Sequence, residues 1–128
     1  MIRHWEEFEG RPNRSRSDEP RVTINKKGML LLNKVAFEAL QEPQAVKLFF
    51  DPNNQSIGLK PSEPGRFNSF PVKQKDKYYN RTVAASPFCK HHGIRVERTM
   101  LFNEVEMDKD GVMTLELKKT TAIGRGSF

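Results

Sequence analysis

The chain has 128 residues, a length that fits one ordinary domain, and a hydrophobic content of 36% predicts that part of it lies outside the core. The formal net charge of +6 favours a polyanionic partner, either nucleic acid or an acidic protein face, although excess lysine also serves solubility. The single cysteine, Cys89, excludes an intrachain disulfide. Because no signal-peptide pattern and no membrane-length apolar run is present, we expect a cytoplasmic protein without membrane association.

Residues 1–20 are expected to form a flexible N-terminal arm, because glycine, proline, asparagine and serine interrupt any helix or strand period. Trp5 and Phe8 stand out in this arm, since their spacing of three lets them share one face of a helical turn. Such a turn would either dock on the body of the protein over an apolar patch or bind a partner chain. The partner would then be a second copy or another protein.

A single globular domain is expected over residues 21–118, and its first half covers residues 21–61. Apolar and alternating runs between turn residues predict four strands in this half, over residues 21–25, 29–32, 46–50 and 56–60. Asn33 fits a helix N-cap, because its side chain can accept from the free N–H groups of the first turn. The helix that follows should end before Pro43.

The segment 62–80 has the composition of a linker and is the most basic part of the chain. Its aromatic residues are interleaved with lysines, a pattern in which lysines bind phosphates and tyrosines stack on unpaired bases. The alternative is a solvated linker whose tyrosine pair anchors it to the body. The candidate nucleic-acid-binding residues here are Lys73, Lys75, Lys77, Tyr78, Tyr79 and Arg81.

The second half, residues 81–118, shows the same order of strand, capped helix and hairpin. Ser86 is predicted as the N-cap of the second helix, with Pro87 at its first position and Gly93 after its end. The hairpin strands are expected over residues 100–107 and 112–117. Residues 119–128 are expected to be a flexible tail.

The repeated order indicates two strand–helix–hairpin units in one chain. The expected fold is therefore mainly β with two short helices (α+β), arranged as a compact pseudo-two-fold β-barrel. Because the two halves share few identical residues, chance recurrence of a common local order is the alternative.

Catalytic residue types come together only in Cys89-Lys90-His91-His92. Cys89 and His92 have a spacing that can share a metal, but a stable zinc site needs two more ligands. We therefore expect Cys89 in the core and the histidines at a polar helix end. The alternating carboxylates of Glu104, Glu106, Asp108 and Asp110 indicate either a solvated acidic face or a weak divalent-cation site. Neither enzymatic activity nor a cofactor is expected.

Residues 22–61 resemble the AbrB/MraZ (SpoVT-AbrB) type of transcription factor, through the segments VTIN, KKG, MLLLN, KVAFEAL, AVKLFF and IGLKP. The resemblance implies a swapped-hairpin barrel, built from two chains in the short members and from two tandem copies in the longer ones. It also implies DNA binding by basic residues on the β-face and turns, which correspond here to Arg21, Lys26, Lys27 and Lys34.

Two functions follow from the sequence. The first is a non-enzymatic nucleic-acid-binding protein, an AbrB-like transcriptional regulator that contacts the phosphates of DNA or RNA through its basic turns and linker. The second is a structural or protein-interaction subunit of a larger assembly, with no nucleic-acid role and with the arm and tail as contact elements.

Overall fold

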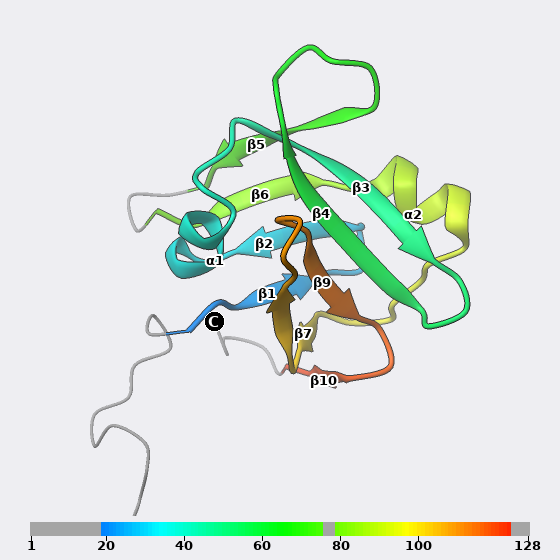
Figure 1. Cartoon of the computed structure of the whole chain (residues 1–128). Coiled ribbons are helices and arrows are strands. Elements are labelled where there is room, and N and C mark those ends of the chain that lie inside the picture. The colour runs from blue at the N-terminus through cyan, green and yellow to red at the C-terminus, as the bar shows by residue number, and fades with distance from the viewer. Residues whose placement is uncertain (1–18, 76–78, 124–128) are drawn as a thin grey trace, which may run out of the picture.

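The structure is a computed structural model that describes residues 19–75 and 79–123 (Figure 1). The described chain forms mainly strands and two short helices, which confirms the predicted mainly β class with two short helices. The helices are α1 (Lys34–Ala39) and α2 (Ser86–His92). The strands are β1 (Val22–Ile24), β2 (Met29–Leu32), β3 (Ala45–Asp51), β4 (Ser56–Ser62), β5 (Ser69–Gln74), β6 (Arg81–Ala84), β7 (Met100–Phe102), β8 (Val105–Met107), β9 (Met113–Glu116) and β10 (Thr120–Ala122).

These strands form one antiparallel sheet in the order β10-β7-β1-β2-β6-β5-β3-β4-β9-β8, which curls into a half-barrel (Figure 1). In the middle of the order β2 pairs with β6, and Leu30 lies opposite Val83. β8 forms one end of this order, and only residues 103–104 separate it in the chain from β7, which is the second strand from the other end. The curl therefore brings the ends of the sheet close together.

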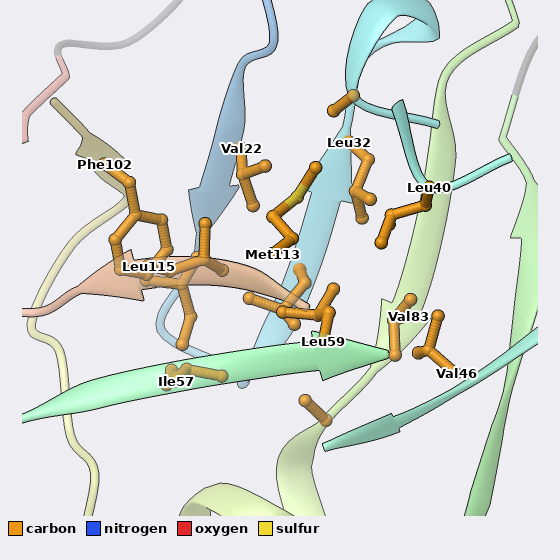
Figure 2. Close-up of a cluster of buried hydrophobic side chains, with 14 of the residues drawn as sticks. Val22, Leu32, Leu40, Val46, Ile57, Leu59, Val83, Phe102, Met113 and Leu115 are labelled. Atoms are coloured by element: carbon orange, nitrogen blue, oxygen red, sulfur yellow. The ribbon is translucent and has the colours of Figure 1, made fainter. Parts of the chain in front are cut away.

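The curled sheet encloses the hydrophobic core, which Figure 2 shows as side chains from several strands pointing toward one another. Strand alternation places every second residue inside. On β2, β4 and β9 the fully buried residues are Leu30, Leu32, Ile57, Leu59, Met113 and Leu115. Each buried side chain of this size stabilises the fold by about 1.5–3 kcal/mol relative to exposure.

Asn33 caps α1 as predicted, because its Oδ1 accepts a hydrogen bond from the backbone N–H of Ala36 at 2.9 Å. The same oxygen accepts from the backbone N–H of Arg21 at 3.0 Å. One buried side chain therefore joins the start of α1 to the start of β1. The helix ends at Ala39, before Pro43, as expected.

The predicted N-cap of α2 is wrong by one residue. Ala85 occupies the N-cap position without a side-chain hydrogen bond, and Ser86 is the first residue of the helix. The backbone explains the shift, because the N–H of Ala85 donates to the carbonyl oxygen of Gly28 at 3.0 Å. This bond extends the contact between β6 and the β1–β2 turn, and the helix starts directly after it. Gly93 ends α2 with a left-handed φ of 67°, as predicted.

Two segments expected to lack regular structure contain strands. β5 lies within the segment 62–80, where Phe70 pairs with Val46 and Val72 pairs with Val83. This strand is difficult to recognise in the sequence because it contains Pro71, and a proline inside a strand-like segment argues against pairing on both sides. β10 lies within the expected tail 119–128 and pairs with β7.

The strand expected over residues 100–107 is interrupted, because Asn103 and Glu104 separate β7 from β8. Within residues 19–75 and 79–123, no helix has the length and apolar composition that crossing a membrane requires.

Candidate nucleic-acid interface

The structure gathers the predicted basic residues at the two ends of the central β2–β6 pair. In Figure 1, α1 and α2 lie at opposite ends of this pair, and α2 begins next to the β1–β2 turn. Lys26 and Lys27 lie in this turn beside α2, whereas Lys34 begins α1 close to Tyr79. The predicted residues therefore divide into two clusters.

The turn cluster consists of Lys26, Lys27, Lys90 and Arg95, which line a cavity of about 350 Å³ between the β1–β2 turn and α2. The turn is rigid, because Asn25 Oδ1 accepts from the N–H groups of Lys27 at 3.0 Å and Met29 at 2.9 Å. Glu97 is the one carboxylate among the lining residues.

None of the four cations in the turn cluster forms an ion pair with another described residue. The cavity therefore combines several unneutralised positive charges with a single acidic side chain. Such a cavity attracts anions, and a phosphate group is the anion that nucleic acids present.

The helix cluster consists of Lys34, Lys73, Lys75 and Arg81, which lie near the opposite end of β2. Lys73 is paired with Thr82, so its side chain leaves the other face of the sheet from that of Arg81. Lys34 Nζ lies 5.0 Å from the centre of the Tyr79 ring, and the Arg81 guanidinium lies 4.3 Å from that of Phe37. These cation–π contacts hold both side chains in place without neutralising their charges. Lys75 joins the cluster through its backbone N–H, which donates to Asn80 at 2.8 Å.

The remaining predicted residues have different positions. Arg21 directly precedes β1, and its backbone N–H donates to Asn33 Oδ1, which places it beside the helix cluster. Lys77 and Tyr78 lie outside the described residues, as do Trp5 and Phe8 of the predicted arm.

Sequence reasoning missed Lys90 and Arg95 as members of the turn cluster. Only the packing of α2 against the β1–β2 turn brings them to Lys26 and Lys27, more than sixty positions away in the chain. The signal in the sequence was a basic residue in a short helix, which alone indicates only a favourable charge near the helix C-terminus.

A second feature missed from the sequence is a like-charge pair on the outer face of the sheet. Lys47 on β3 lies directly opposite Lys60 on β4. Like charges in directly opposed positions destabilise a sheet, and neither lysine forms an ion pair with another described residue.

Changing Lys60→Glu should therefore increase the free energy of unfolding by about 0.5–1 kcal/mol, because the opposed repulsion becomes an attraction. Urea denaturation of the wild-type and variant chains measures the change. Adding Lys47→Glu to the same chain restores a like-charge pair, so the double variant should lose the gain. An equal stability of the single and double variants would show that the two side chains do not interact.

Cys89 is buried, as predicted, and desolvation raises the pKa of its thiol. A raised pKa lowers the thiolate fraction at neutral pH and makes the thiol a poor nucleophile. The neighbouring His92 packs its ring 4.8 Å from the rings of both Phe50 and Phe88. In the described part of the chain, no three side chains of metal-ligating type come together.

The alternating carboxylates do not act as one group. Glu104 forms an ion pair with Lys119 at 3.3 Å. Asp108 instead shapes the β8–β9 turn, where its Oδ1 accepts from the N–H groups of Asp110 at 2.8 Å and Val112 at 2.9 Å. Of the two interpretations, the solvated acidic face fits these contacts better than a cation site.

The chain was compared with known protein families, with curated proteins and with solved structures, and none of the three comparisons finds a match.

Proposed function

We propose that this protein binds duplex DNA without catalysing a reaction, and that the turn cluster and the helix cluster contact the phosphates. The observation that carries the proposal is the grouping of eight cations at the two ends of β2, none of them ion-paired with another described residue. Solubility alone does not require such grouping, because dispersed lysines with nearby carboxylates serve it equally well.

The spacing of the clusters suits a duplex. Lys27 and Lys34 lie beyond the two ends of β2, seven positions apart, so at most about 23 Å separates their Cα atoms. A duplex of that length carries roughly a dozen phosphates on its two strands. Two clusters at this distance can therefore contact several phosphates at once, without any base-specific contact.

We also propose that the barrel consists of two structurally equivalent units. The strand pairs support this idea: β1–β2 corresponds to β5–β6, and the β3–β5 pair corresponds to the β7–β1 pair. In the β3–β5 and β7–β1 pairs, the strand that follows the helix of one half pairs with a hairpin strand of the other half. The β2–β6 and β4–β9 pairs would lie on the pseudo-two-fold axis.

This exchange of strands is the arrangement that the resemblance to the AbrB/MraZ type implies for tandem copies. In that arrangement the turn cluster and the helix cluster are equivalent sites, each formed by the hairpin turn of one unit and the helix of the other. A transcriptional regulator of this type is the specific form of the proposal.

Titration of a fluorescein-labelled short duplex with the full chain, followed by fluorescence anisotropy at several salt concentrations, tests the proposal. For about six phosphate contacts, affinity should fall by about a thousandfold between 50 and 200 mM salt. Absence of binding at the lowest salt would overturn the proposal and favour the protein-interaction subunit.

A further inference from the structure

The outer face of β3 and β4 combines an exposed aromatic ring with the opposed lysine pair. Phe49 is 49% exposed although it lies inside a strand. It is two positions from Lys47, so both side chains leave the same face of the sheet, about 7 Å apart. Gly58 lies opposite Phe49 and has no side chain to cover the ring.

A cavity of about 530 Å³ opens beside Phe49, between β3, the β4–β5 loop and α2. Its apolar walls include Phe49, Phe70 and Phe88, and its polar groups include Lys47 and Asn68. No carboxylate is among the described residues that line it. The size and the mixture of aromatic walls with a few polar groups are those of a small-ligand site.

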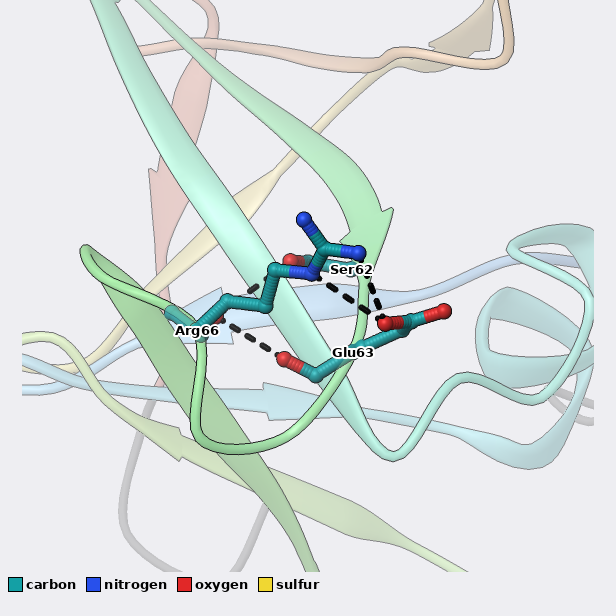
Figure 3. A network of polar contacts seen from close by, with 4 residues as sticks. Ser62, Glu63 and Arg66 are labelled. Atoms are coloured by element: carbon teal, nitrogen blue, oxygen red, sulfur yellow. Dashed lines mark hydrogen bonds and ion pairs between the residues drawn. The ribbon is translucent and has the colours of Figure 1, made fainter.

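The β4–β5 loop, which supplies Asn68, is held by its own contacts. Figure 3 shows Arg66 over Glu63, and the Arg66 Nε and Nη2 atoms donate to Glu63 Oε2 at 3.1 and 3.0 Å. Ser69 Oγ also donates to the carbonyl oxygen of Glu63 at 3.0 Å. These bonds pair Arg66 with Glu63, and Lys47 is the one lysine or arginine among the described residues that line the cavity, which also include His91 and His92.

We propose that this cavity binds one unpaired nucleotide of a single-stranded nucleic acid. The base stacks on the ring of Phe49, the Asn68 amide is available to its polar edge, and the adjoining phosphate lies at Lys47 and Lys60. A phosphate there neutralises the opposed lysines, which accounts for a like-charge pair on a stable sheet. Base stacking on an aromatic ring next to basic residues is the general way in which proteins hold single strands.

This site is separate from the two basic clusters, so its test uses two ligands in parallel. A fluorescein-labelled short oligo(dT) and a duplex of the same length are titrated with the full chain at low salt. Because Phe49 also covers Gly58, the main variant is Phe49→Leu, which keeps an apolar side chain but removes the aromatic face. It should weaken oligo(dT) binding by about 5- to 150-fold and leave duplex binding unchanged.

Phe49→Trp should restore oligo(dT) binding, because it provides an aromatic face again. Phe67→Ala is the matched control: Phe67 is 87% exposed but does not line the cavity, so its removal should change neither affinity. The inference is overturned if the Leu and Trp variants bind oligo(dT) equally, or if the wild-type chain does not bind it.

The two proposals fail in different ways. Wild-type binding of the duplex but not of oligo(dT) overturns the nucleotide cavity alone. Binding of oligo(dT) that depends on Phe49, without duplex binding, supports the cavity and overturns the duplex proposal. Retention of an acidic peptide by the wild-type chain that Phe49→Leu abolishes, without retention of oligo(dT), would replace the nucleotide by a peptide.

Discussion

Replacing Gly28 by alanine is expected to lower the free energy of unfolding by about 2–4 kcal/mol, from backbone strain and a steric clash together. Gly28 has a φ of +79°, in the left-handed region that L-residues rarely adopt. A Cβ at this position would lie 2.9 Å from the Cα of Ser86, which is a backbone atom and cannot rotate away. The turn must then move off α2, and with it the lysines of the turn cluster.

Gly65→Ala is the matched control, because Gly65 has the same φ of +79° but no atom within 4 Å of a built Cβ. This variant should lower the free energy of unfolding only through backbone strain, by about 1–2 kcal/mol. Chemical denaturation of both variants measures the difference. Equal losses would mean that the close contact between Gly28 and Ser86 contributes nothing to stability.

Asn33→Ala is expected to lower the free energy of unfolding by about 2–4 kcal/mol, because two donors lose their acceptor. The side chain of Asn33 is 7% exposed and accepts from Ala36 in α1 and from Arg21 before β1. Alanine removes both the helix cap and the hydrogen bond that joins the start of α1 to the residue before β1. Thermal and urea denaturation should both show the loss.

Asn33→Asp distinguishes the hydrogen bonds that the Asn33 side chain accepts from the one that it donates. Aspartate keeps the acceptor oxygen for Ala36 and Arg21, but it cannot donate to the carbonyl oxygen of Glu19, to which Asn33 Nδ2 donates at 2.7 Å. We expect it to lose less than half of what alanine loses. If aspartate were as destabilising as alanine, the cap would not be the main contribution of Asn33.

The elements that could be predicted are those whose signals are local. Asn33, Gly28 and Gly93 mark a helix start, a turn and a helix end by their own chemistry, and the structure has them in these roles. The alternation along β9 likewise separates its two faces in the sequence, and Met113 and Leu115 on one of these faces are fully buried.

The elements that were missed depend on partners far along the chain. β5 is a strand because β3 and β6 pair with it on both sides, which Pro71 concealed. β10 is a strand because its backbone pairs with β7. The N-cap of α2 shifted because the Gly28 carbonyl binds the Ala85 N–H, a contact between the two halves.

The candidate sites follow the same division. Lys26, Lys27 and Lys34 were expected from the resemblance to the AbrB/MraZ type, whereas Lys90 and Arg95 needed the packing of α2. The opposition of Lys47 to Lys60 depends on the β3–β4 register, and the cavity beside Phe49 depends on where α2 lies. Neither the β3–β4 register nor the position of α2 can be predicted from composition alone.

Charge reversal in each cluster, followed by the salt dependence of duplex binding, tests whether the two clusters bind the phosphates of a duplex. The variants are Lys27→Glu/Lys90→Glu in the turn cluster and Lys34→Glu/Lys75→Glu in the helix cluster. Lys109→Glu/Lys118→Glu is the control, because both residues are exposed, lie outside the two clusters and change the net charge equally. We predict that each cluster variant binds less tightly and lowers the slope of log affinity against log salt by about two, while the control keeps the wild-type slope. Equal weakening by all three variants would contradict the account, because net charge and not the clusters would then determine binding.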